Sequence, residues 1–311
     1  MKMTLEDKNN IRARLERYCA RYTSQNRAAA SLKGVSAGTV STIINGKFDN
    51  ISDDMFKKIA AQIAGGRIWS IAETKQFREI TFYLSESQSE KTVGWIVAPA
   101  GTGKTKTAEI YTQEHRDVFY LLCARDMSKA DFIRELARIM GLNTAGLRVR
   151  GILQLIINEA TKLNDPLFIF DEADKLNDNV FAYFIDIYNR LRYMVGMVFL
   201  STSHIRKRID AGLRLDKPGY QEFFSRIGRK FIEVSPVDAH DVASVCMANG
   251  VTDKGMIATI CDLSEVNDSI IYRRSAKRAI DNPNRRVIYD IRRVEDAVRV
   301  LKRKEARLNA N

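Results

Sequence analysis

The chain has 311 residues, of which 45% are hydrophobic and 28% are charged, as is typical of a soluble globular protein. No window approaches about 18 uncharged apolar residues, and the first residues, MKMTLEDKNN, do not resemble a signal peptide, so we expect no membrane association and no secretion. Four scattered cysteines without a C-x-x-C pair, together with three histidines, argue against a disulfide framework or a zinc site and indicate a cytoplasmic protein.

The net charge of +12 is concentrated at the two ends of the chain. Residues 1–64 carry 11 Lys and Arg against 6 Asp and Glu, and residues 271–311 carry 13 against 5. Basic ends around a nearly neutral middle favour a polyanionic partner, because lysine and arginine neutralise phosphates. The alternative is that these charges only solvate helix faces.

Residues 1–64 are predicted to form a compact helical domain that contains a helix-turn-helix. Apolar residues recur at helical spacing along the first part of this segment. An alanine-rich helix then ends near Leu32, Gly34 supplies a turn, and Ser36 can cap the following helix. This arrangement places the second helix of the pair in the major groove of DNA.

The second helix of this motif has an apolar and a polar side. Val40 and Ile44 lie four residues apart, so we expect both to face the core. The polar side is poor in Arg, Asn and Gln, the side chains that read base edges, which favours binding without strong sequence preference. A helical bundle that only mediates protein contacts is the alternative. The predicted DNA contacts here are Ser36, Thr39 and Thr42.

Residues 65–236 alternate apolar strand patterns with amphipathic helices, which indicates an α/β domain around a parallel sheet. The paired glycines in AGGRIWS mark the linker at its start. Residues 237–311 show no strand pattern and are predicted to be helical. The predicted strands are GWIVAP, VFYLLCA, PLFIFD and GMVFLSTS, with helices such as KADFIRELARIM and GILQLIINEATKL between them.

The segment APAGTGKT lies between a predicted strand and a predicted helix, which is the context of a phosphate-binding loop. Lys104 would reach the β- and γ-phosphates of a nucleotide, and the Thr105 hydroxyl would bind Mg²⁺. Ala98 stands where this motif usually begins with glycine, and a methyl group is tolerated there if φ stays negative. The predicted nucleotide contacts are Pro99, Ala100, Gly101, Thr102, Gly103, Lys104, Thr105 and Lys106.

Two acidic residues follow the buried strand pattern of residues 167–170. Asp171 would emerge at the carboxyl end of this strand, where parallel sheets bind ligands, and would hold Mg²⁺ together with Thr105. Glu172 is suited to orient and deprotonate an attacking water, which favours hydrolysis over nucleotide sensing alone. The alternative is a strand end with solvated acids.

Two further positions downstream are candidates for the same site. The strand MVFLSTSH ends in polar residues, among which Ser203 is expected to contact the γ-phosphate or the attacking water. An ordinary strand-terminating turn is the alternative. In FFSRIGRK, Arg226 is expected to stabilise transition-state charge in the site of a neighbouring subunit. Arg226 and the nearby Arg229 are otherwise plain surface charges.

These motifs, in this order, resemble the AAA+ ATPases that act in DNA transposition. GTGKT, FIFDEAD, the strand that ends at His204 and FFSRIGRK carry the resemblance, and SLKGVSAGTVSTIINGK is similar to the helix-turn-helix of those proteins. The resemblance implies an α/β AAA+ P-loop core over residues 65–236. It also implies a helix-turn-helix domain over residues 1–64 and an all-α lid domain over residues 237–311.

The resemblance assigns roles to the acidic and polar residues named above. Asp171 and Glu172 match the Walker B motif, Ser203 matches the first sensor, and Arg226 matches the arginine finger. The first sensor is commonly asparagine in the family, and serine is shorter. The candidates for a second sensor on the lid side are Arg273 and Arg274.

The resemblance further implies an ATPase that uses ATP and Mg²⁺ and forms helical filaments of many copies around double-stranded DNA. Such filaments present target DNA to a transposase, and hydrolysis to ADP and phosphate drives disassembly. A phage or mobile-element origin would place the protein in the cytoplasm of a bacterial host. The backbone contacts expected from the core are Arg125, Lys129, Arg148 and Arg150, for which solvated helix ends are the alternative.

Two other functions share part of this pattern. A helicase-loader type of AAA+ ATPase has the same core motifs, but the helix-turn-helix favours independent contact with duplex DNA. A transcriptional regulator switched by ATP would bind one operator sequence, whereas the side chains that read bases are sparse on the second helix.

Overall fold

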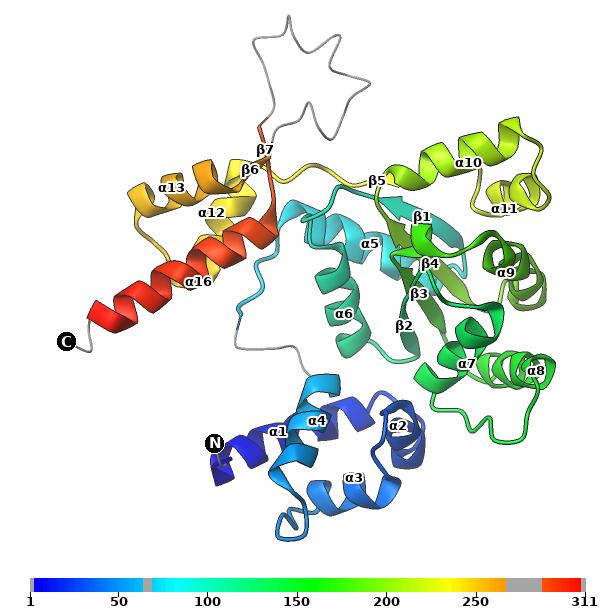
Figure 1. Ribbon diagram of the computed structural model, residues 1–311, viewed down its shortest axis with the longest axis horizontal. Coiled ribbons are helices and arrows are strands. Elements are labelled where there is room, and N and C mark those ends of the chain that lie inside the picture. The colour runs from blue at the N-terminus through cyan, green and yellow to red at the C-terminus, as the bar shows by residue number, and fades with distance from the viewer. Residues whose placement is uncertain (1–2, 64–68, 267–286, 309–311) are drawn as a thin grey trace, which may run out of the picture.

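The computed structural model describes residues 3–63, 69–266 and 287–308. Within these ranges, no helix combines the length and the apolar character that crossing a membrane requires. Three parts follow one another along the chain: four short helices, a central sheet with helices on both faces, and a smaller helical unit (Figure 1).

The central sheet has five parallel strands in the order β2-β3-β4-β1-β5. The order places β1, which leads into the phosphate-binding loop, between β4 and β5, whereas β3 lies on the other side of β4. The fifth strand escaped the sequence prediction because only two of its residues pair. The strands are β1 (Val93–Val97), β2 (Val118–Leu122), β3 (Leu167–Asp171), β4 (Gly196–Ser201) and β5 (Ile232–Glu233).

Successive side chains of these strands point to opposite faces of the sheet, and both faces are covered. Leu167 and Ile169 pack with the helices on one face, whereas Phe168 and Phe170 pack with those on the other. This explains why the strands are continuous apolar runs. The first face carries α5 (Lys75–Ser89) and α6 (Lys104–Glu114). The second carries α7 (Lys129–Ile139), α8 (Val149–Ala160), α9 (Asp178–Leu191), α10 (His204–Arg214) and α11 (Tyr220–Arg226).

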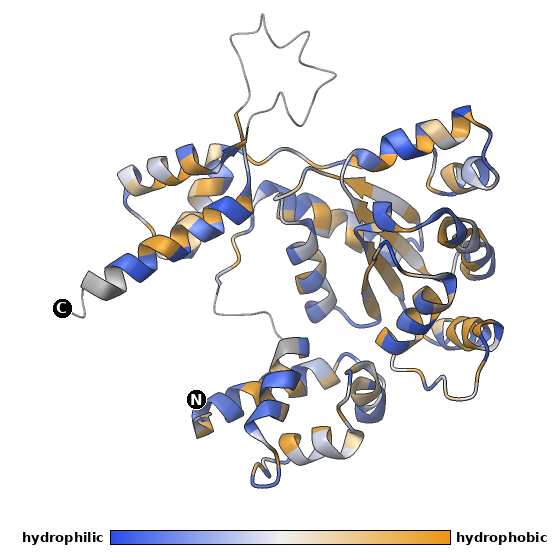
Figure 2. Ribbon diagram, in the orientation of Figure 1, coloured by the Kyte–Doolittle hydropathy of each residue, from blue (hydrophilic) through white to orange (hydrophobic). Residues whose placement is uncertain are grey.

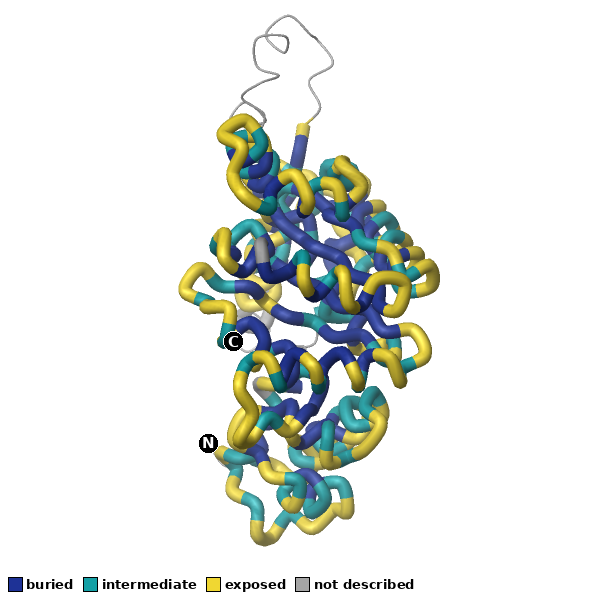
Figure 3. The backbone as a smooth tube through the Cα atoms, turned by 90° about the vertical axis from the view of Figure 1, so that its right-hand side faces the viewer, coloured by how far each residue is buried: buried dark blue, intermediate teal, exposed yellow. Residues whose placement is uncertain are grey.

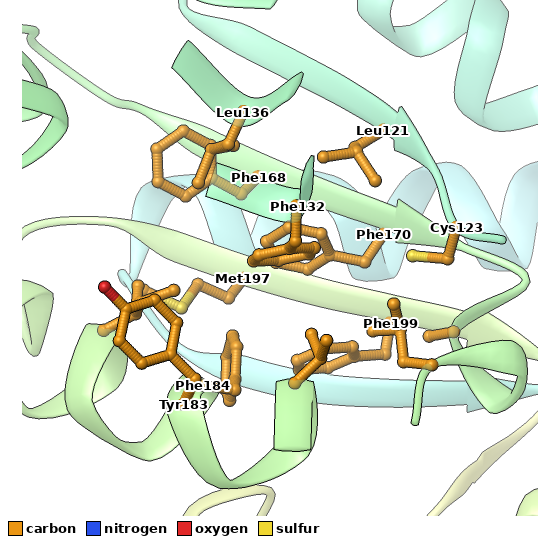
Figure 4. Close-up of a cluster of buried hydrophobic side chains, with 14 of the residues drawn as sticks. Leu121, Cys123, Phe132, Leu136, Phe168, Phe170, Tyr183, Phe184, Met197 and Phe199 are labelled. Carbon is orange, nitrogen blue, oxygen red and sulfur yellow. The ribbon is translucent and has the colours of Figure 1, made fainter. Parts of the chain in front are cut away.

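Aromatic rings fill the second face (Figure 4). Phe199 on β4 stacks on Trp95 and on Phe170, with ring centroids 4.7 Å and 5.2 Å apart. The burial pattern shows these strands enclosed between the flanking helices (Figure 3). The indole of Trp95 donates a hydrogen bond of 2.7 Å to the Ser201 hydroxyl, so its polar atom is satisfied inside the core. This hydrogen bond joins β1 to the end of β4, next to the site.

The first four helices share a separate apolar core, in which Leu15, Val40 and Phe56 are fully buried. The sequence predicted that Val40 and Ile44 face this core. Val40 does, but the fully buried partner is Ile43, three residues on, and Ile44 is only partly buried. The buried face of this helix is therefore rotated by one residue from the predicted one. The helices are α1 (Leu5–Cys19), α2 (Gln25–Ser31), α3 (Ala37–Ile44) and α4 (Asp53–Ile63).

In its described residues, the last part of the chain contains three helices that share another apolar core, which also includes Trp69 from the segment before α5. The prediction of an all-helical unit was wrong in one respect. Two strands of two residues each, β6 (Glu265–Val266) and β7 (Ile288–Tyr289), pair antiparallel within it. Strands this short leave no periodic signal in a sequence. The helices are α12 (Ala239–Ala248), α13 (Lys254–Ser264) and α16 (Ile291–Leu308).

Candidate nucleotide-binding site

The loop between β1 and α6 has the backbone of a phosphate cradle. Gly101 and Gly103 adopt φ values of 78° and 88°, which disfavour residues with a Cβ, and Gly103 is the N-cap of α6. Ala98 instead extends β1: its amide donates to the Ser201 carbonyl over 3.2 Å, and its side chain is buried. The substitution of the usual glycine therefore falls in the strand, before the part of the loop where glycine is required.

Lys104 opens α6 and is buried beneath the loop. Its Nζ atom donates hydrogen bonds to the carbonyl oxygens of Ala98 (2.8 Å) and Pro99 (2.7 Å). Burial lowers the pKa of this ammonium group from 10.5 to about 8, and Asp171 opposes that shift. Phosphate charges at the loop would favour the charged lysine and raise its pKa again.

Nucleotide binding is therefore expected to take up a proton at Lys104 at about pH 8 and above, so that affinity falls as the pH rises from about 7 to 9. The free protein has partly lost the lysine proton in this range, whereas the complex retains it. Calorimetry of ATP binding in two buffers with different ionisation heats measures this uptake.

The matched control is Lys207→Met, which removes an exposed lysine of α10 that does not line the cavity. We expect it to retain the proton uptake. Equal proton uptake at pH 7 and 9 in the wild-type chain would show that Lys104 does not titrate on binding.

The carboxylate of Asp171 lies at the end of β3 and is almost completely buried. Its Oδ2 atom accepts hydrogen bonds from the hydroxyls of Thr105 (2.6 Å) and Tyr120 (2.9 Å). A carboxylate beside a threonine hydroxyl is an oxygen donor set that suits Mg²⁺, which keeps its other positions for water and phosphate oxygens. Tyr120 was not a sequence candidate; its position on β2, the strand next to β3, brings it to the same carboxylate.

Glu172 follows directly and turns the chain out of the sheet. It adopts φ 53° and ψ 35°, its amide donates to Asp171 Oδ1 over 2.8 Å, and a 3₁₀ turn (Ala173–Lys175) begins after it. The Glu172 side chain lines the same cavity as Lys104 and forms an ion pair with Lys175. A non-glycine residue with positive φ at a strand end is the kind of strained position that occurs at functional sites.

The residues after β4 are arranged differently from the sequence expectation. Ser203 is exposed at the start of α10 and does not line the cavity. The preceding Thr202 lines the cavity and donates a hydrogen bond of 3.1 Å to Asp174. The sequence predicted a contact from this polar segment at Ser203, whereas the neighbouring Thr202 lines the cavity.

The last helix closes the cavity from the opposite side. The amide of Ile291 donates to the Gly101 carbonyl over 2.9 Å, and a Cβ on Gly101 would collide with the Asp290 carboxylate. Arg292, in the first turn of α16, lines the cavity, and its charge acts on Lys104. The second-sensor candidates Arg273 and Arg274 lie outside the described residues. Arg292 was missed because it lies in a basic tail that has no motif around it.

The cavity that these residues enclose has a volume of about 1060 Å³. Every turn of α6 contributes to its wall, so it extends along the whole helix. A set of apolar side chains beside the phosphate loop suits a nucleotide base, and Arg17 and Arg21 of α1 line a further part. The apolar set is Ile71, Ala72, Phe77, Ile110 and Val245.

Comparison with known proteins agrees with this geometry. A family model described as an AAA domain matches residues 87–209, which include the phosphate loop, Asp171 and Thr202. The chain is also 23% identical over 252 residues to the Mu-like prophage FluMu DNA transposition protein B of Haemophilus influenzae, a match that covers 76% of this chain and 84% of that protein. The chain resembles an AAA+ ATPase of DNA transposition.

Solved structures with a related arrangement are larger proteins. The Aeropyrum pernix ORC1 protein in complex with DNA is 16% identical with a TM-score of 0.47, and Cdc6p from Pyrobaculum aerophilum is 16% identical with a TM-score of 0.42. The matches cover 75% and 61% of this chain, which spans 61% and 52% of theirs.

Arg226 lies at the end of α11 and does not line the cavity beside the phosphate loop. Its guanidinium donates to Asn189 Oδ1 over 3.1 and 3.3 Å and to the Glu222 carbonyl over 2.9 Å. It also lies over the Tyr188 ring. These contacts fix a partly exposed arginine on the surface.

The predicted DNA contacts fall into two groups. Ser36 caps α3 by accepting from the Thr39 amide over 3.0 Å, and Thr42 donates to the Gly38 carbonyl, so these hydroxyls also serve the helix itself. On the α/β core, the predicted arginines and lysine are exposed. Two of them, Lys129 and Arg150, line a second cavity of about 440 Å³ together with Arg190. Arg125 and Arg148 lie on the exposed surface outside that cavity.

Proposed function

We propose that this chain is an ATP-dependent DNA-binding ATPase that assembles on double-stranded DNA and delivers target DNA to a transposase. The single observation that carries the proposal is the convergence of Lys104, Asp171 and Glu172 on one cavity, in a chain similar to a DNA transposition protein B. The similarity to a DNA transposition protein supports a role in transposition, and the residues of the cavity support ATP hydrolysis.

The site would hydrolyse ATP with this chain's own residues in distinct roles. Lys104 binds the β- and γ-phosphates, and Thr105 with Asp171 would hold Mg²⁺, which neutralises charge on the phosphate oxygens. Glu172 orients the attacking water and accepts its proton. Thr202, linked to Asp174, lies in the same cavity and is better placed than Ser203 to contact that water or the γ-phosphate.

The site is completed from outside the α/β core. Arg292, at the start of the helical unit we propose as the lid, contacts phosphate from the far side of the cavity. Arg226 does not line its own cavity and would act in the next subunit, which would make each active site a product of assembly. A head-to-tail contact of this type continues as a ring or a helical filament.

DNA would be held through its phosphates. The helices α2 and α3 are proposed to form a helix-turn-helix, with α3 in the major groove. On the core, Lys129 and Arg150 are joined by Arg190 in a basic groove between α7, α8 and α9. Together with Arg125 and Arg148, this groove would follow the backbone without reading bases.

Electron microscopy with duplex DNA of arbitrary sequence tests this function. We expect filaments on the DNA with ATP and none without it, and no filaments with the Lys104→Ala variant under either condition. Lys207→Ala is the matched control, because it removes an exposed lysine of α10 that does not line the cavity. Tight binding to one short palindrome without polymerisation would instead favour the ATP-switched regulator.

A further inference from the structure

The N-terminal helices are docked on the core by polar contacts. The apolar cluster of α1–α4 is distinct from the clusters on the two faces of the sheet. The described contacts between α2 and the ends of α7 and α8 are instead hydrogen bonds and ion pairs. Interfaces between domains that are more polar than a protein core commonly permit relative movement.

Two hydrogen bonds from side chains to main-chain carbonyls hold the N-terminal helices against the core. The Tyr22 hydroxyl donates to the Ile139 carbonyl over 3.1 Å, and the Arg138 guanidinium donates to the Ser31 carbonyl. At Gly141, which has a φ of 69°, a Cβ would collide with the Arg27 carbonyl. The backbone of α2 therefore approaches the core closely at the end of α7 (Figure 1).

Two ion pairs of this interface have the same polarity. Arg27 of α2 forms an ion pair with Glu159 of α8, whose side chain is only 14% exposed. Lys33, just after α2, lies 3.7 Å from Glu135 of α7. In both pairs the cation comes from the N-terminal helices and the carboxylate from the core. Hydrogen bonds from Lys162 and Arg27 hold the pKa of the Glu159 carboxyl below its ordinary value.

The same two cations stand where a helix-turn-helix meets DNA. In this motif the first helix crosses the DNA backbone while the second lies in the groove. Here the first helix is α2, so Arg27 and Lys33 are suited to contact phosphates. A guanidinium binds carboxylate and phosphate in the same forked geometry, so one partner excludes the other.

We propose that Glu159 and Glu135 occupy the phosphate-binding face of α2, so that duplex DNA must displace these core carboxylates before the N-terminal helices can bind it. The proposal rests on the proposed function, because it takes α2 and α3 as a DNA-binding unit. The core thereby lowers the affinity of the free chain for DNA. Once DNA holds α2, the N-terminal helices leave α7 and α8.

The test combines two variants with opposite expected effects on DNA. Glu159→Gln keeps the size of the side chain but removes its charge, so it should undock the N-terminal helices and tighten DNA binding about three- to tenfold, because apparent affinity scales with the competent fraction. Arg27→Gln should undock them equally but weaken DNA binding. Small-angle scattering without nucleotide measures undocking as a larger radius of gyration, and fluorescence anisotropy with a short duplex at fixed salt measures affinity.

Asp165→Asn is the matched control, because it removes one carboxylate from a core ion pair with Lys91 and changes the net charge equally. The proposal is overturned if Glu159→Gln matches this control in both radius and affinity, or if Arg27→Gln tightens DNA binding. A wild-type chain that binds no duplex DNA would overturn the proposed function as well. If the wild type binds DNA but Glu159→Gln has no effect, only the proposed competition between the core carboxylates and DNA is overturned.

Discussion

Glu172→Gln is expected to lower the rate of ATP hydrolysis by about 10²- to 10⁴-fold while leaving ATP binding intact. The amide keeps the shape of the side chain and its place in the cavity but cannot accept a proton from water. Phosphate release under saturating ATP measures the hydrolysis rate, and calorimetry measures the affinity. Because disassembly is proposed to need turnover, filaments of this variant should persist on DNA with ATP.

The control for this prediction is Glu109→Gln, the same change at another carboxylate that lines the cavity, where Glu109 pairs with Lys106. It should leave hydrolysis close to the wild-type rate. If Glu172→Gln turns over ATP as the wild type does, Glu172 is not the base.

Arg226→Ala is expected to reduce hydrolysis by about 10³- to 10⁵-fold, as the loss of an arginine finger does, without weakening ATP binding to the isolated chain. The reason is geometric, because Arg226 does not line its own cavity and is proposed to act on a neighbour's phosphates. Steady-state ATPase assays with saturating DNA report the loss. Arg229→Ala is the control, since Arg229 is exposed three residues further on.

Mixing the two inactive variants separates a shared site from a structural defect. In an equal mixture of Arg226→Ala and Glu172→Gln chains, about a quarter of the interfaces in a head-to-tail assembly combine an intact Glu172 with an intact Arg226. Hydrolysis should therefore return to about a quarter of the wild-type rate. A mixture as inactive as its components would place Arg226 outside the active site.

The local motifs allowed much of the α/β core and its nucleotide site to be predicted. The four long strands are apolar runs, because helices cover both faces, and such runs are visible in any sequence. The loop around Gly101 and the acids after β3 are contiguous motifs whose chemistry depends on neighbours in the chain. Hydropathy along the ribbon follows the same pattern, with apolar strands between helices of mixed character (Figure 2).

The parts that sequence reasoning missed depend on contacts between distant residues. Whether Thr202 or Ser203 enters the cavity depends on where β4 ends, and a shift of one residue reverses the direction of the side chain. Arg292 lines the cavity because Ile291 is hydrogen-bonded to Gly101, 190 positions earlier in the chain. The strands β5, β6 and β7 are pairs of residues that only a folded neighbour stabilises.

The hydrogen bond from Ile291 to Gly101 makes α16 a lever arm attached to the phosphate loop. This helix has 18 residues, so it is about 27 Å long. A tilt of about 10° at the loop would carry its far end through about 5 Å, given the rise of a helix. A small movement of the phosphate loop would therefore move the far end of α16 much further, at a surface that a neighbouring molecule can contact.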